Sequence, residues 1–130
     1  MERFESLGGG VWVCVSDAHR FGTDAFLLAD FAAPRKKDRV CDLGTGCGIL
    51  PLYLYQRYSV ASCCGVELQE DAALQFQKGI ERSGAGERLR ALCADLKDAP
   101  GLLPKAGFDL VTCNPPYKAN GAGIESGDPA

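Results

Sequence analysis

The sequence predicts an α/β fold with a doubly wound, mainly parallel sheet. Short apolar runs alternate with helix-like segments, the pattern that parallel strands joined by crossover helices produce. The first run enters a glycine-rich turn, and polar residues stand at or just past the ends of successive runs: Asp42, Glu67, Asp95 and Asn114. Parallel strands end at one edge of the sheet, where ligands bind in open α/β folds. These four side chains are therefore expected to share one site.

Local signals place the elements along the chain. The run 11–15 follows three glycines and is expected to be one arm of a hairpin. Thr23 is expected to cap a helix over 24–33, which Pro34 ends. Two more helices are expected over 49–57 and 70–83, and strands begin at Val40 and cover 60–66, 89–93 and 108–113.

The third helix has the clearest amphipathic pattern. Small and apolar residues recur at helical spacing, which predicts one buried stripe made of Ala72, Ala73, Phe76 and Ile80. Gly84 follows the helix and is expected to end it, because glycine adopts the left-handed conformation of a helix C-terminus without steric strain.

The glycine turn after the first strand predicts a ligand-binding loop. Glycines occupy every second position at Gly44, Gly46 and Gly48, and they let a ligand approach the backbone closely. The spacing differs from the dinucleotide fingerprint because Ile49 follows, and no Walker lysine is present. Glu67 lies about twenty residues further on, where an acid can accept hydrogen bonds from both ribose hydroxyls of a nucleoside.

The segment Asn114–Tyr117, with the sequence Asn-Pro-Pro-Tyr, is the most specific motif. Its two prolines fix two φ angles and remove two backbone donors. The resulting rigid corner presents an amide, two carbonyls without competing donors and an aromatic ring. That set suits a planar amine, which can donate to the amide oxygen and a carbonyl while a flat group stacks on the ring. An ordinary strand-ending turn is the alternative for this segment, as a solvated loop residue is for Asp95.

The chain resembles the class I S-adenosylmethionine (SAM)-dependent methyltransferases. Within them it is most similar to the bacterial tRNA adenine-N6 methyltransferases that modify the adenine beside the anticodon of a valine tRNA. Three stretches carry the resemblance: Arg20–Ala32, Asp42–Gly48 and Asn114–Tyr117. The glycine loop is shared by many methyltransferases, whereas the other two stretches are narrower signatures.

The resemblance implies SAM as cofactor and a Rossmann-like sheet of seven strands, of which this chain holds about four. Residues 1–117 are then an incomplete SAM-binding methyltransferase domain, and 118–130 a flexible, loop-like tail. The implied catalytic residues are Asn114, Pro115, Pro116 and Tyr117. The implied cofactor-binding residues are Thr23, Asp24, Asp42, Gly44, Thr45, Gly46, Gly48, Glu67, Leu68, Asp95, Leu96 and Asn114.

Three functions remain open at this point. The first is methylation of an adenine N6 amine in tRNA. The second is methylation of a glutamine N5 amide in a protein, as in the release-factor enzymes, which the resemblance implies use the same turn. The third is a truncated SAM-binding module without catalysis. The segment Arg20–Ala32 favours RNA over protein by about two to one on motif matching alone.

Composition is that of a cytoplasmic α/β domain, with 46% hydrophobic and 24% charged residues. No run of about eighteen apolar residues is present, so no membrane span is expected. The net charge of −3 is unusual for an RNA-binding protein. The one cationic run, Arg35–Arg39, precedes the first strand and therefore belongs to the opposite end of the sheet. His19, Arg20 and Lys118 flank the expected site.

The seven cysteines predict reduced core residues of a cytosolic protein rather than a metal site. No C-x-x-C spacing occurs, and His19 is the only histidine. Five cysteines lie in the expected strands, where cysteine acts as a small buried hydrophobe: Cys41, Cys63, Cys64, Cys93 and Cys113. Cys47 lies in the glycine loop and is expected to be reachable by a thiol reagent.

The last expected strand, 108–113, becomes an edge in the strand order 3-2-1-4 that the resemblance implies. Its residues are those of an interior strand, and an apolar edge is a template for pairing with another chain. The sequence therefore predicts self-association through this strand, or a further segment that covers it.

Overall fold

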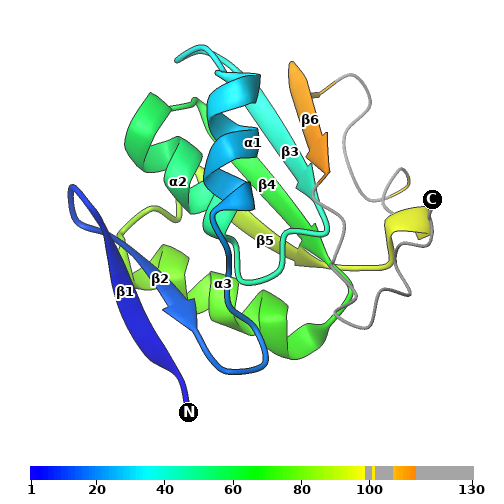
Figure 1. The fold of residues 1–130 in the computed structure, drawn as a ribbon. Coiled ribbons are helices and arrows are strands. Elements are labelled where there is room, and N and C mark those ends of the chain that lie inside the picture. The colour runs from blue at the N-terminus through cyan, green and yellow to red at the C-terminus, as the bar shows by residue number, and fades with distance from the viewer. Residues whose placement is uncertain (99–100, 102–106, 114–130) are drawn as a thin grey trace.

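The structure, a computed structural model, describes residues 1–98, 101 and 107–113. It contains a two-stranded hairpin and a four-stranded sheet with three α-helices (Figure 1). The elements in chain order are β1 Arg3–Gly8, β2 Val11–Val15, α1 Asp24–Ala32, β3 Arg39–Leu43, α2 Ile49–Tyr58, β4 Ser62–Glu67, α3 Glu70–Arg82, β5 Leu89–Cys93, the short 3-10 helix η1 Leu96–Asp98, and β6 Leu110–Cys113.

The four-stranded sheet is parallel throughout and has the order β5-β4-β3-β6. This arrangement confirms the predicted α/β class and the predicted 3-2-1-4 order. The register places Leu43 of β3 beside Val66 of β4 and Cys113 of β6. The carboxyl ends of these strands therefore meet at one edge of the sheet.

The helices cover one face of the sheet (Figure 1). The crossovers through α2 and α3 advance in the same direction across the sheet, so a common right-handed sense puts both helices on the same side. α1 packs beside α2, where Phe26 meets the ring of Tyr53 edge to face with 4.8 Å between ring centroids. The largest fully buried side chains of this core include Phe76, Leu50, Leu52 and Leu54.

The hairpin places β2 against α3 (Figure 1). Its turn uses three consecutive glycines, Gly8 to Gly10, all with positive φ, which favours glycine over residues that carry a Cβ atom. Strand 11–15 is confirmed, and β1 is its antiparallel partner. The buried β2 leads directly into the segment that reaches the sheet edge, so the hairpin anchors that segment at its start.

The predicted stripe of α3 is confirmed, because Ala72, Ala73, Phe76 and Ile80 are all buried. Gly84 ends the helix as predicted, with φ of 64°. Its N–H bonds the carbonyl of Glu81, and the N–H of Ala85 bonds that of Ile80, the pair of contacts that defines a Schellman motif.

Two local predictions are corrected. Thr23 does precede α1, but its backbone is already helical, with φ −68° and ψ −18°, and its side chain makes no capping hydrogen bond. A capping side chain needs an extended backbone at that position to reach back to the helix. Cys47 is only 2% exposed, because it packs in the core below the glycine loop, and burial raises the pKa of its thiol to about 11. It is therefore shielded from thiol reagents.

The cysteines of the sheet divide by position. Cys41, Cys63 and Cys64 are buried in the two central strands, as predicted. Cys93 and Cys113 are exposed, which corrects the prediction for them, because they end the two outer strands of the sheet among the described residues. No described helix is long and apolar enough to cross a membrane.

Gly48 should be the least replaceable glycine of the loop. Its φ is 85°, and a Cβ atom built there would overlap the buried ring of Phe76. Gly48→Ala should lower the free energy of unfolding by about 2–5 kcal/mol, the sum of backbone strain and overpacking. Gly10→Ala is the matched control: its φ is 81° with nothing within 4 Å, so about 1–2 kcal/mol is expected. Urea denaturation measures both, and equal losses would contradict the packing role.

Candidate functional site

A pocket of about 650 Å³ opens at the carboxyl edge of the sheet. This volume falls in the range of small-molecule sites. One wall comes from the segment between β2 and α1, and the opposite walls come from the glycine loop and the ends of β4 and β5. The lining residues are Ala18 to Gly22, Asp24, Ala25, Gly44 to Cys47, Ile49, Glu67 to Gln69, Ala72, Asp95 and Leu96.

The backbone of β4 holds the glycine loop in place. The carbonyl of Val66 accepts hydrogen bonds from the N–H groups of Gly44 (2.8 Å) and Thr45 (2.9 Å). The N–H of Gly46 donates to Oε1 of Glu67 at 2.8 Å. A Cβ atom at Gly46 would meet nothing within 4 Å, so the loop leaves open space at this position.

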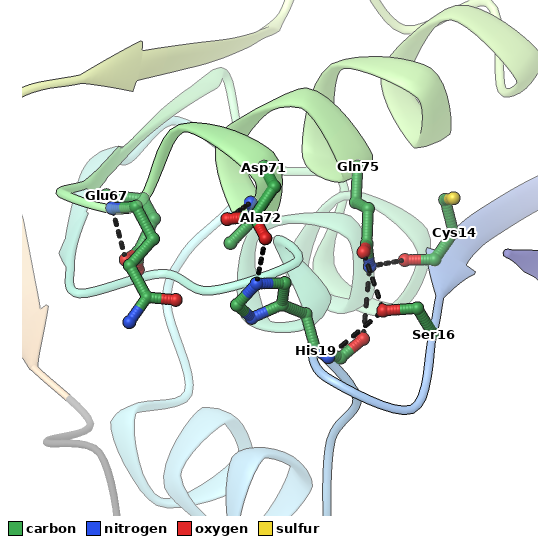
Figure 2. Close-up of polar contacts among 8 residues, drawn as sticks. Cys14, Ser16, His19, Glu67, Asp71, Ala72 and Gln75 are labelled. Carbon is green, nitrogen blue, oxygen red and sulfur yellow. Dashed lines mark hydrogen bonds and ion pairs between the residues drawn. The ribbon is translucent and has the colours of Figure 1, made fainter. Parts of the chain in front are cut away.

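Glu67 is the acid best placed to bind a ligand in this pocket. Its two oxygens each accept one backbone N–H, from Gly46 and from Gln69 (3.0 Å), and these bonds fix its orientation. Figure 2 shows the second of these contacts at the start of α3. Because each carboxylate oxygen has a second lone pair, Glu67 can still accept hydrogen bonds from the vicinal hydroxyls of a ribose.

Asp42 has a different environment. It is 1% exposed and does not line the pocket. Its Oδ2 accepts the hydroxyl of Thr45 at 2.7 Å, and its Oδ1 accepts that of Thr112 on β6 at 2.6 Å. Burial raises the pKa of Asp42 to about 6, although both hydroxyl hydrogen bonds act to lower it. Asp42 thus joins the glycine loop to β6, and it is hydrogen-bonded to the pocket lining through Thr45.

The structure brings most predicted cofactor residues to one pocket. Those that line it are Asp24, Gly44, Thr45, Gly46, Glu67, Leu68, Asp95 and Leu96. Thr23, Asp42 and Gly48 do not line it. The predicted catalytic residues Asn114, Pro115, Pro116 and Tyr117 lie outside the described residues. Among the described residues, no group of three His, Cys, Asp or Glu side chains could hold a metal ion.

Sequence reasoning missed the inner side of the pocket wall. Phe21 lines the pocket and packs edge to face on Phe26 of α1 with ring centroids 5.6 Å apart. Gln75 of α3 is 2% exposed and binds the backbone of the same wall. A signal existed for Gln75: it falls on the apolar stripe of its helix, and a polar residue there needs an internal partner.

A second hollow, of about 720 Å³, lies at the opposite end of the sheet, lined by residues such as Arg39, Ser62 and Arg88. It contains neither the glycine loop nor any of the strand-end acids. Since ligands of parallel α/β sheets bind at the carboxyl ends of the strands, we assign the functional site to the pocket at Glu67.

Comparison with known proteins agrees with this fold. The family described as "Methyltransferase domain" matches residues 40–120. The chain belongs to this family. The match begins in β3 and includes the glycine loop, Glu67 and Asp95.

Two curated relatives illustrate the similarity. The tRNA1(Val) (adenine(37)-N6)-methyltransferase of Shewanella halifaxensis is 38% identical over 99 residues, which cover 76% of this chain and 40% of the relative. The protein of the same name from Pedobacter heparinus is 36% identical over 103 residues, covering 79% and 43%. The chain therefore spans less than half the length of these relatives.

Two solved structures show the same fold. The C-terminal domain of precorrin-6Y C5,15-methyltransferase from Rhodobacter capsulatus superposes with a TM-score of 0.65 at 20% identity, covering 81% of this chain and 55% of that one. An RNA methyltransferase from Salinibacter ruber, in complex with S-adenosyl-L-homocysteine, gives a TM-score of 0.62 at 17% identity, covering 72% and 58%. These likenesses confirm the Rossmann-like methyltransferase fold.

Asp42 should make stability depend on pH. A carboxyl whose pKa rises from 3.8 to about 6 on folding binds its proton more tightly in the folded chain. Its stabilisation is complete below about pH 4 and is lost as pH rises through about 6. Between these pH values the loss is about 3 kcal/mol. Asp42→Asn should remove this pH dependence of stability, which urea denaturation between pH 4 and 7 would measure.

Asp109→Asn is a control, because the pH dependence expected from Asp109 has the opposite sign. The backbone N–H and guanidinium of Arg39 lower the pKa of Asp109, so its contribution is present at neutral pH and is lost on acidification. If wild-type and Asp42→Asn chains give parallel pH profiles, the buried carboxyl does not titrate as described.

Proposed function

We propose that this chain is the cofactor-binding part of a SAM-dependent N-methyltransferase that acts on the N6 amine of an adenine in tRNA. One observation carries the proposal: Cys113, the last residue of β6, pairs with Leu43 of β3. β6 thus ends at the sheet edge that carries the glycine loop and Glu67, and the Asn-Pro-Pro-Tyr segment follows β6 directly in the sequence. This order supports a site for a planar amine next to the cofactor site.

The residues of the pocket fit the proposed cofactor. Glu67 offers carboxylate lone pairs to the ribose hydroxyls, and Asp95, at the end of β5, offers an acceptor to the adenine amine. The open backbone at Gly46 gives room for the methionine portion. When bound, SAM supplies a methyl group on a positively charged sulfonium centre.

The chemistry that we propose is positioning of the target nitrogen. Asn114 and the carbonyl of Pro115 accept the two N6 hydrogens, and Tyr117 stacks on the base. These contacts draw the nitrogen lone pair out of conjugation and aim it at the methyl group. No strong base is needed for the attack: the N–CH3 bond would form as the S–CH3 bond breaks, so the positive charge would pass from sulfur to N6. The acidified N6 proton would then leave to water, and the rate gain comes from orientation and electrostatics. A paired or stacked adenine must first be extruded.

The proposal extends to partner, location and domain boundary. The partner is tRNA in the cytoplasm, and residues 1–117 form the cofactor-binding domain, incomplete as in the sequence prediction. His19 and Arg20 lie at the pocket, and Arg20 provides a cationic group on the side where RNA would approach. The run Arg35–Arg39 leads into the amino end of β3, away from the pocket. The tail expected over 118–130 lies outside the described residues.

The assignment of Glu67 can be tested with S-adenosylhomocysteine, the demethylated cofactor. Glu67→Ala should weaken binding about 30- to 100-fold, because hydrogen bonds from two ribose hydroxyls to a carboxylate contribute about 2–3 kcal/mol. Glu70→Ala is the matched control, since Glu70 is exposed at the start of α3 and does not line the pocket. Calorimetry measures both, and unchanged affinity in Glu67→Ala would contradict the ribose assignment.

Methyl transfer from labelled SAM to bulk tRNA tests the reaction itself. In a full-length version of the protein, transfer to tRNA but not to release factor is expected. Asn114→Ala should abolish this transfer while cofactor affinity changes less than about twofold, because the amide contacts mainly the target nitrogen. Transfer to release factor alone would favour the glutamine enzyme. Cofactor binding without any transfer would favour the non-catalytic module.

We also propose that the chain self-associates through β6. This strand is an outer strand of the sheet among the described residues. Val111 on it is 56% exposed, and Leu110 is half-buried. An apolar, unprotected edge favours pairing with another strand. Sedimentation at micromolar concentration should show dimers or larger species, and Val111→Lys should shift the population toward monomer. A monomeric wild-type chain would contradict this proposal.

A further inference from the structure

The pocket wall formed by residues 16–22 is a connection without helix or strand between β2 and α1. Five of its residues, Ala18 to Gly22, line the pocket. A wall made of irregular backbone needs tertiary contacts to hold one position. Within the described residues, the polar contacts from this segment to other elements converge on α3.

Gln75 of α3 makes the first set of hydrogen bonds to this segment. Its side chain is buried, and both the nitrogen and the oxygen of its amide form hydrogen bonds (Figure 2). Nε2 donates to the carbonyls of Cys14 (3.1 Å) and His19 (3.0 Å). Oε1 accepts the hydroxyl of Ser16 at 2.8 Å. One side chain thus joins the last part of β2 to both ends of the turn that follows it.

The turn itself is closed by Ser16 and His19. The N–H of Ser16 donates to the carbonyl of His19 at 2.9 Å, and the N–H of His19 donates to the Ser16 hydroxyl at 3.1 Å. Because that hydroxyl also donates to Gln75, all three residues form one continuous network. Displacing the turn would break several bonds of this network together.

Asp71, one helical turn before Gln75, makes a second contact with this segment. Its Oδ2 lies 2.9 Å from Nε2 of His19 (Figure 2). Residues four apart share one face of a helix, so Asp71 and Gln75 contact the segment from the same side of α3. The same helix begins beside Glu67 and Gln69, which line the opposite side of the pocket. α3 therefore sets the spacing between the two walls.

We propose that Gln75 is a positioning residue for cofactor binding: its buried amide fastens segment 16–22 to α3 and thereby holds one wall of the pocket at the distance that the ligand requires. This inference rests on the proposed function, because it takes S-adenosylhomocysteine as the ligand. It assigns to Gln75 no contact with the ligand.

Gln75→Met tests the proposal, since methionine has a similar size but makes none of the three hydrogen bonds. Gln77→Met is the matched control: Gln77 lies on the same helix, does not line the pocket and bonds only Glu81 in the described part of the chain. Two quantities are measured well below the melting temperature of each variant. They are the affinity for S-adenosylhomocysteine, by calorimetry, and the rate of tryptic cleavage after Arg20, relative to cleavage at 35–37.

Gln75→Met should weaken binding at least tenfold and speed cleavage after Arg20 at least tenfold, with cleavage at 35–37 unchanged. Gln77→Met should change neither quantity. A merely structural role would lower the melting temperature of Gln75→Met and leave both quantities unchanged, and that result would overturn the proposal. If Gln75→Met does not fold, Ser16→Ala, which removes one bond of the network, should weaken binding and speed cleavage about threefold. Wild-type values in that variant would also overturn the proposal.

The two proposals fail in different ways. A wild-type chain that does not bind S-adenosylhomocysteine would overturn the cofactor assignment and the positioning role together. A wild-type chain that binds it, with equal affinity in Gln75→Met, would overturn the positioning role alone.

Discussion

The site depends on the two hydrogen bonds that the buried carboxylate of Asp42 accepts. Asp42 stands in β3, at the centre of the sheet, and its two oxygens hold Thr45 of the glycine loop and Thr112 of β6. An acid inside a protein is costly unless hydrogen bonds compensate its desolvation. Here the two hydroxyls offset only part of that cost, because the pKa of Asp42 is still raised. The glycine loop and β6 are thereby both fixed to one carboxylate.

The remaining walls depend on α3. Its start orients Glu67 through the N–H of Gln69, and its buried face holds the segment 16–22 through Gln75 and Asp71. The apolar stripe of the same helix seats it against the sheet and the hairpin, so packing in the core fixes the polar geometry at the edge. Two buried polar side chains, Asp42 and Gln75, thus position three separate parts of the site.

The sequence predicted the helices and the pocket edge because these follow from short-range patterns, whereas the sheet order was predicted from the family resemblance. Apolar runs, the glycine spacing and the stripe of α3 are each visible within about fifteen residues. Contacts between distant residues were not predictable in the same way. Asp42 was expected to contact the ligand. Its pairing with Thr112 could not be predicted, because Thr112 lies seventy positions further along the chain. Cys47 was expected to be reachable, because loop residues are usually exposed, whereas it packs in the core below the loop.

Gln75 shows which kind of contact could not be predicted from the sequence. A glutamine on an apolar stripe indicates a buried polar network, but the sequence does not say which backbone it binds. Its partners, Cys14 and His19, are about sixty residues away. Removing the amide would leave these backbone carbonyls without their donor, which costs stability. The same hydrogen bonds fix the position of the pocket wall, and this second effect connects the core residue to the site.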